Sequence, residues 1–266
     1  MLSEFRQNLS RSLGALALTL LCGLAIGFLQ VPQLNKLTAK AKTASPQELK
    51  EEVEAEKIRM DLLKKVPDFG FDNIFADLAF LGFAEYFGDD LAREGTGYFL
   101  SPDYFDVIVD RDPRFLKAYL FLSNSISLYA GMPEKSVALM EKGLKSIAKK
   151  PLPKSYYVWR YKGTDELLFL GDAQAARQSF EKAAEWAIAY SDPESQNVAA
   201  ISRQTAQFLA RNPNSKFAQV GAWTMVLQNA VDERTRKIAV SRIEALGGKV
   251  VITPEGGVQV KLPEKD

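Results

Sequence analysis

The stretch WRYKGTDELLFLGDAQAARQSFEKAAEWA, residues 159–187, decides the fold because it places small residues at helical spacing around a glycine. Gly163 would let a first helix approach its neighbour closely, and Gly171 permits the positive φ of a tight turn. Ala176 would let a second helix pack against the first, while Phe180 fills the gap between them. The stretch therefore predicts an antiparallel pair of helices joined by a short turn.

A second copy of this pattern precedes the first by forty residues. Tyr119 and Gly131 are twelve residues apart, as are Trp159 and Gly171, and the two pairs are offset by forty. The same shift relates Ser123 to Gly163, Ser136 to Ala176, Met140 to Phe180, Gly143 to Ala183 and Leu144 to Ala184. Self-similarity at such a period is the signature of stacked helical repeats, which together bury a core that no single unit could bury.

This spacing resembles the tetratricopeptide repeat (TPR) family. In that family a large aromatic residue, a small residue and a turn glycine are followed by alanine, a bulky residue and alanine. Trp159, Gly163, Gly171, Ala176, Phe180 and Ala183 occupy those places. The period of forty exceeds the family's thirty-four, and each first helix carries one extra residue before its turn glycine. The resemblance covers about residues 115–188 and implies a solenoid whose first helices line a concave groove.

Further segments complete a helical-repeat domain at 69–247. They are a degenerate unit that includes Phe75 to Gly88, a third pair at 197–212 and 215–230, and a capping helix at 232–246 that Gly247 and Gly248 end. Residues 249–263 alternate around a Glu-Gly-Gly turn, which predicts a small β-hairpin. The expected fold is therefore an all-α, TPR-like solenoid with a C-terminal hairpin and an N-terminal transmembrane helix.

The transmembrane helix is predicted at Leu13 to Val31, after an N-terminal segment of residues 1–12. The run holds no charge over nineteen residues, about the length that crosses ~30 Å of hydrocarbon. A cleaved signal peptide is the alternative, but the run is long and lacks a small-residue cleavage site at its end. Its Cys22 follows Leu21, which is too large for the position before a lipidated cysteine. Basic residues flank both ends, so the positive-inside rule gives no orientation.

A polar linker at 32–44 leads to a charged helix at 45–66. Ser45 and Glu48 have capping-box spacing, with proline at the first helical position, and Val66-Pro67 should end the helix. Its apolar stripe consists of Leu49, Val53, Met60 and Leu63, interrupted by Glu56. Two interpretations stay open: a short coiled coil with a partner, and a solvated helix that leans on the domain. The second is favoured because the apolar stripe covers too few turns for a coiled coil.

The composition argues against catalysis. Histidine is absent, which removes the usual general base and the commonest metal ligand. The net charge of +1 gives no bulk attraction to nucleic acid, and neither an EF-hand nor a P-loop spacing occurs. We therefore expect no enzymatic activity, cofactor, metal, nucleic-acid partner or small-molecule substrate. The alternative is an unrecognised hydrolase that uses Asp77 and Glu85, two turns apart on one predicted helix.

Two sets of residues are candidate binding surfaces. By the family resemblance, the groove would be lined by Lys117, Leu120, Asn124, Ser127, Tyr161 and Asp165. The second set is a basic-aromatic patch of Lys149, Lys150, Lys154, Tyr156 and Tyr157. Such a patch can contact a protein or a lipid headgroup or stack bases. Alternatively, the aromatic residues belong to the core and the lysines solubilise a linker. This second interpretation is favoured.

These features together predict a membrane-anchored scaffold. It would bind other membrane proteins or their soluble segments and assist the assembly or stabilisation of membrane complexes. The alternative is a permanent structural subunit of an envelope or membrane complex. The chain also resembles anchored repeat proteins of bacteria, including cyanobacterial ones that help assemble photosynthetic complexes. That resemblance implies a single-pass protein of a plasma or thylakoid membrane.

Overall fold

The computed structural model describes residues 16, 19–32, 45–67, 70–148, 151–230, 232–252 and 258–266. Outside these ranges lie the predicted segment 1–12, part of the predicted anchor Leu13 to Val31, most of the linker 32–44 and the turn of the predicted hairpin. Among the described residues, no helix combines the length and the apolar character that crossing a bilayer requires.

The described chain is helical apart from one two-stranded sheet, which confirms the prediction of a mainly α-helical chain with a small C-terminal hairpin. The first elements are α2 (Pro46–Lys65), α3 (Asp72–Gly88), α4 (Asp90–Thr96), α5 (Ser101–Arg111), α6 (Ala118–Leu122) and the π-helix η1 (Ser123–Tyr129). Next come α7 (Pro133–Ile147), α8 (Tyr156–Leu168), α9 (Ala173–Ala187), α10 (Pro193–Arg211), α11 (Lys216–Gln228) and α12 (Glu233–Ala245). Strands β1 (Lys249–Ile252) and β2 (Val258–Lys261) pair antiparallel, and Val250 faces Val260 in the register.

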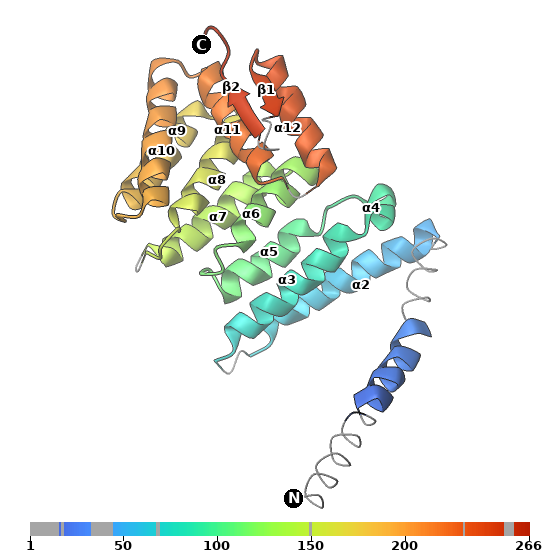
Figure 1. Ribbon diagram of the computed structural model, residues 1–266. Coiled ribbons are helices and arrows are strands. Elements are labelled where there is room, and N and C mark those ends of the chain that lie inside the picture. The colour runs from blue at the N-terminus through green and yellow to red at the C-terminus, as the bar shows by residue number, and fades with distance from the viewer. Residues whose placement is uncertain are drawn as a thin grey trace, which may run out of the picture.

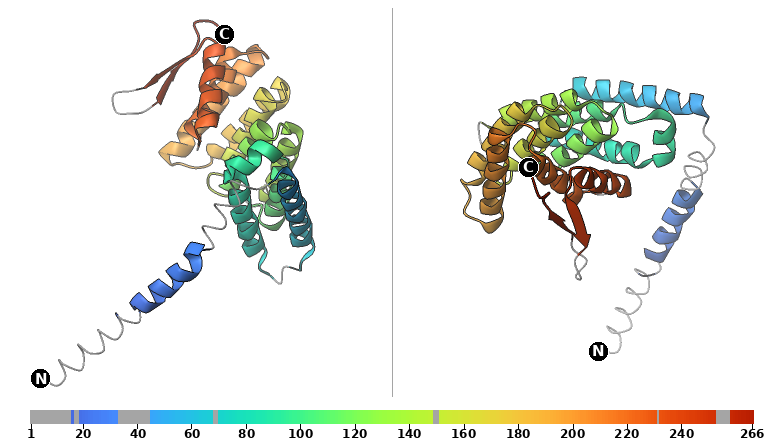
Figure 2. Two further views of the ribbon diagram at one scale, coloured as in Figure 1. Left: turned by 90° about the vertical axis from the view of Figure 1, so that its right-hand side faces the viewer. Right: turned by 90° about the horizontal axis from the view of Figure 1, so that it is seen from above.

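The helices stack side by side into a curved layer. Figure 1 shows α2 and α3 at one end of the stack and α9 and α10 at the other. Seen from above in Figure 2, the stack bends, and α12 and the hairpin lie on the inner side of the bend. The separate helical segment at 19–32 precedes the stack.

The forty-residue repeat is visible in the hydrogen bonds of two turns. In the first turn, the amides of Ala130 and Met132 donate to the carbonyls five and six residues earlier, at 2.9 Å each. In the second, Leu170 and Asp172 make the same bonds at 3.1 and 2.8 Å. The glycine between the donors has a φ of +66° in one turn and +68° in the other. The extra residue before each glycine is thus accommodated by hydrogen bonds that span five or six residues instead of the four of an α-helix. In the first unit a whole π-helical segment accommodates it.

Close approach of α8 and α9 explains the small residues at 159–187. A Cβ added to Gly163 would lie 3.2 Å from both the Phe180 ring and the Ser179 Cβ, and 3.3 Å from the Ala176 carbonyl. Ala176 itself is fully buried. The two helices therefore have no room for larger side chains at these positions.

Substituting Ala176→Trp should overpack this interface and lower the free energy of unfolding by about 3 kcal/mol. Chemical denaturation of the full chain in a mild detergent would measure the loss. The control is Gln174→Trp, which adds the same side chain to an exposed position of α9. Equal stability of the two variants would contradict the packing of α9 on α8.

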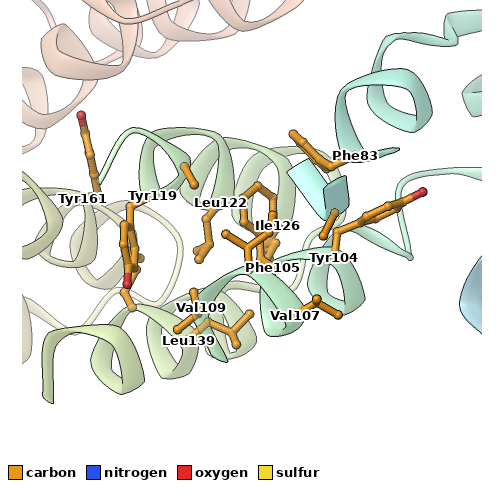
Figure 3. Packing of buried hydrophobic residues seen from close by; sticks show 14 of the residues in the cluster. Phe83, Tyr104, Phe105, Val107, Val109, Tyr119, Leu122, Ile126, Leu139 and Tyr161 are labelled. Atoms are coloured by element: carbon orange, nitrogen blue, oxygen red, sulfur yellow. The ribbon is translucent and has the colours of Figure 1, made fainter. Parts of the chain in front are cut away.

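The main core lies where α3, α5, η1 and α7 meet. Figure 3 shows Phe83, Phe105 and Ile126 from three of these elements gathered around one centre, with Leu139 of α7 at its edge. Phe105 and Ile126 are fully buried. The ring centroids of Phe83 and Phe105 are 4.6 Å apart in an edge-to-face arrangement, which stabilises aromatic pairs beyond the area they bury. This core holds the N-terminal half of the stack together.

Helix α2 packs on the domain. Both hydrogen bonds of its capping box are present at Ser45. Met60 is fully buried, and Val53 is partly buried against the main core. Glu56, which interrupts the apolar stripe, accepts a hydrogen bond from the Tyr104 hydroxyl at 2.8 Å. This geometry agrees with the interpretation of a helix that leans on the domain.

The C-terminal helices pack against the inner side of the stack. Met225 of α11 belongs to the main core, and Trp223 meets Phe169 edge-to-face with centroids 5.8 Å apart. At the start of α12, the carboxylate of Asp232 accepts a hydrogen bond from the Tyr129 hydroxyl at 2.5 Å. The chain therefore covers with its own helices much of the concave surface that the sequence predicts to be an open groove.

Candidate functional site

The structure divides the predicted groove residues. Lys117 is exposed, and Leu120 and Asn124 are half-buried on the first helix of the unit. The prediction is wrong for Ser127 and Asp165, because both are buried and the Ser127 hydroxyl donates to the Asp165 carboxylate at 2.5 Å. These two side chains cannot line a groove, since η1, α7 and α8 enclose them.

Asp165 is instead the centre of a buried hydrogen-bond network. The hydroxyls of Ser123 and Ser136 each donate to its carboxylate at 2.6 Å, in addition to that of Ser127. Complete burial raises the pKa of the carboxyl to about 7, and the three hydrogen bonds act in the opposite direction. The network ties α8 to η1 and α7, so the role that it supports for Asp165 is structural.

The next residue, Glu166, is buried on another side of α8. It forms an ion pair with Lys162, which lies one turn earlier on the same helix, and accepts a hydrogen bond from the Ser179 hydroxyl of α9 at 2.6 Å. Ser179 is itself buried. Consecutive acidic residues therefore bind α8 to the helices on both of its sides.

The predicted basic-aromatic patch does not form one surface. Tyr156 is fully buried, with its hydroxyl 2.9 Å from a serine hydroxyl of α10. Lys154 and Tyr157 both donate to the Glu194 carboxylate, at 2.6 and 3.0 Å. Two further members of the predicted patch, Lys149 and Lys150, lie outside the described residues. The aromatic core and the intramolecular ion pair thus account for the members that the structure describes.

Tyr161 lines a cleft between α8, α10, α11 and β2. The cleft has a volume of about 700 Å³, and the hydroxyl of Tyr161 points away from the main core (Figure 3). Most of the remaining lining is polar, and includes Asn197, Thr224, Gln228, Asn229 and Gln259. Elements far apart in the sequence therefore converge on one concave surface, in which polar groups lie beside apolar ones.

Arg160 is the unusual residue of this cleft. Its Nε is buried and has no hydrogen-bond partner. The titratable groups closest to its guanidinium are the neutral phenols of Tyr156, Tyr157 and Tyr161, with no carboxylate from the described residues among them. Burial lowers the pKa of the guanidinium, although arginine stays protonated in proteins. A buried N–H group without an acceptor is unfavourable.

The sequence shows Arg160 only as one cation within the aromatic run YYVWRY, and sequence reasoning did not single it out. The run itself is the one local signal, because aromatic neighbours at helical spacing can bury a guanidinium. The lack of an acidic partner depends on which segments of α10, α11 and β2 face α8. That information is present only in the tertiary structure.

Asp77 and Glu85, the alternative catalytic pair, are not brought into one cavity. Both side chains are exposed on α3. Glu85 lines a cleft between α2 and α3, and Asp77 is not part of its lining. The described part of the chain also contains no cluster of acidic or cysteine side chains suited to a metal ion.

Comparison with known proteins gives no match to any family model, curated protein or solved structure. The described part of the chain is a stack of antiparallel helices with a cleft between α8, α10, α11 and β2, and the buried Nε of Arg160 in that cleft has no hydrogen-bond partner among the described residues.

Proposed function

We propose that this chain is a membrane-anchored helical-repeat scaffold that binds protein partners and assists the assembly or stabilisation of membrane protein complexes. The observation that carries the proposal is the cleft between α8, α10, α11 and β2. Its amide, hydroxyl and guanidinium groups suit recognition of a polypeptide, which offers both peptide groups and charged side chains.

A TPR-like character is part of this proposal. It is supported by the spacing of small and aromatic residues at 159–187, by the two equivalent turns and by the close packing of α8 on α9. The π-helix and the inward position of α11 and α12 differ from the simple pattern of the family. Because these helices cover part of the inner surface, we place the partner in the remaining cleft rather than along a continuous groove.

The membrane anchor is also proposed, from sequence and exposure together. The run Leu13 to Val31 carries no charge. In the described segment 19–32, Leu24 is 74%, Phe28 82% and Leu29 73% exposed. Exposed apolar side chains of this kind support contact with a membrane. We therefore assign the segment to a bacterial plasma or thylakoid membrane, with the repeat domain outside the bilayer.

The test is purification of the tagged full-length chain from gently solubilised membranes, followed by quantitative mass spectrometry. An assembly factor should bring down membrane proteins in substoichiometric amounts, whereas a permanent subunit would show a fixed ratio to its partners. Recovery of no specific partner would count against the proposal. Alkaline carbonate should leave the wild type in the membrane fraction and release a variant that lacks residues 13–31.

A further inference from the structure

We infer that the cleft between α8, α10, α11 and β2 is a carboxylate-binding site, in which Arg160 pairs with an acidic side chain of an extended segment of a partner protein. The inference rests on the proposed function and specifies the chemistry of the partner. It is carried by the guanidinium of Arg160, whose buried Nε has no hydrogen-bond partner among the described residues and which lines a cleft of mixed polar and apolar side chains.

Arg111 shows how this fold satisfies a buried arginine. Its Nη1 pairs with the Asp72 carboxylate at 3.0 Å, and its Nη2 donates to the carbonyls of Leu63 and Val66 at 2.6 Å each. Arg160 has no comparable set of acceptors among the described residues, although its Nε is buried. The difference indicates that the acceptor for Arg160 comes from another molecule.

The charge around Arg160 favours a carboxylate as that acceptor. The planar guanidinium binds a carboxylate through two parallel hydrogen bonds. The nearby ammonium of Lys154 is already paired with Glu194 at 2.6 Å. The cleft thus offers one unpaired positive charge, which matches one carboxylate. A phosphate, with a charge approaching two, would remain partly uncompensated there.

The free edge of β2 favours an extended segment. β2 pairs with β1 along one edge, and within the described residues no strand pairs with its other edge. Gln259, Val260 and Leu262 contribute to the lining of the cleft, whereas β1 does not, and Val260 packs against a cluster that includes Val220 and Trp223 of α11. A strand added along β2 would find backbone partners there. Its alternate side chains point to opposite faces, so one set can reach toward α8.

The amides in the cleft fit the same occupant. Asn197 and Gln228 make no side-chain hydrogen bond within the described part of the chain, and both line the cleft. Each offers a donor and an acceptor to a peptide group. The stacked rings of Tyr157 and Tyr161, with centroids 6.2 Å apart, form the adjacent wall. The cleft therefore combines peptide recognition with a single charged contact.

The experiment is a selection from random twelve-residue peptides displayed on phage, fused at their C-termini so that only side-chain carboxylates are presented. The bait is the full-length chain in nanodiscs of phosphatidylcholine. Three forms are compared: wild type, Arg160→Gln, and Arg203→Gln as the matched control. Arg203 is an exposed arginine of α10 that does not line the cleft.

Wild type and Arg203→Gln should enrich peptides with Asp or Glu, and Arg160→Gln should not. For one enriched peptide, exchange of its acidic residue for the amide should weaken binding to the wild type at least tenfold. The same exchange should have little effect on binding to Arg160→Gln, because the partner of the carboxylate is already gone. Arg160→Lys, which keeps the charge without the planar fork, should bind with intermediate affinity.

Thermal unfolding distinguishes a binding role of Arg160 from a structural one. Arg160→Gln should melt no lower than the wild type, because the variant removes a buried Nε–H that has no acceptor among the described residues. A clearly lower melting temperature would overturn the inference, as would a wild type that enriches no acidic peptide. Recovery of the same membrane partners by wild type and Arg160→Gln would refute the inference alone. Recovery of none by the wild type would refute the proposed function.

Discussion

The variant Gly143→Ala should lose about 3 kcal/mol of unfolding free energy, although it adds only one methyl group. The new Cβ would lie 2.7 Å from Cζ and 2.9 Å from Cε1 of Tyr119. The Tyr119 ring is buried in the main core, and its hydroxyl donates to the Pro113 carbonyl at 2.9 Å. The ring cannot move aside without leaving the core or breaking that hydrogen bond, so the strain remains in the folded state.

Gly221→Ala is the matched control, because Gly221 also lies inside a helix but no heavy atom is within 4 Å of its added Cβ. That variant should be stabilised by up to about 1 kcal/mol, since alanine is the better helix former. Urea denaturation of both full-length variants in a mild detergent measures the contrast. Adding Tyr119→Leu to Gly143→Ala should recover part of the loss, and strict additivity of the two substitutions would contradict the contact.

The equivalent position in the next repeat shows why the glycine is needed only once. Forty residues after Gly143 the chain has Ala183, and forty after Tyr119 it has Trp159. Trp159 packs edge-to-face on Trp186, with centroids 5.9 Å apart. The aromatic ring of this repeat has a different neighbour, and a Cβ is accommodated at residue 183.

Asp165→Ala should destabilise the chain by roughly 3–5 kcal/mol, because it removes the common acceptor of three buried hydroxyls and leaves a cavity. The hydroxyls belong to Ser123, Ser127 and Ser136, all of them buried. Denaturation under the same conditions measures this loss. The control is Asp77→Ala, at an exposed position of α3, where a change within about 0.5 kcal/mol is expected. A comparable loss in both variants would mean that the network contributes nothing.

The same carboxylate predicts a pH dependence with a defined sign. Burial raises the pKa of Asp165 from 3.8 to about 7, so between these values the folded chain holds a proton that the unfolded chain releases. The contribution of this group is therefore complete below pH 3.8 and falls as the pH rises to about 7. Above that it is constant, after a total change of roughly 4 kcal/mol.

Asp165→Asn isolates this effect because the amide does not titrate. The difference in unfolding free energy between wild type and Asp165→Asn should vary between pH 5 and pH 7 and then level off. Comparison with Asp77→Asn over the same range controls for general effects of losing an acidic residue. If the difference in unfolding free energy between wild type and Asp165→Asn does not change with pH, the carboxyl of Asp165 does not titrate in this range.

The features that the sequence predicted correctly depend on local backbone chemistry. The capping box at Ser45, the positive φ of Gly171 and the stop at Gly247, with a φ of +87°, each involve residues within one turn of the chain. The two strands of the hairpin follow from alternation around their turn. Small residues at helical spacing likewise predicted the close approach of α8 and α9. Such signals need no knowledge of where the rest of the chain goes.

Only the tertiary structure decided which helical faces stay open. The sequence placed Asp165 and Ser127 in a groove and left Tyr156 open between a surface patch and the favoured aromatic core, and all three are buried. The cover comes from neighbouring helices: η1, α7 and α8 enclose Asp165 and Ser127, and α10 packs on Tyr156. Helical periodicity shows which residues share a face, but burial depends on what packs against that face. The unpaired guanidinium of Arg160 is a property of this kind, because it depends on which groups the distant segments bring to the cleft.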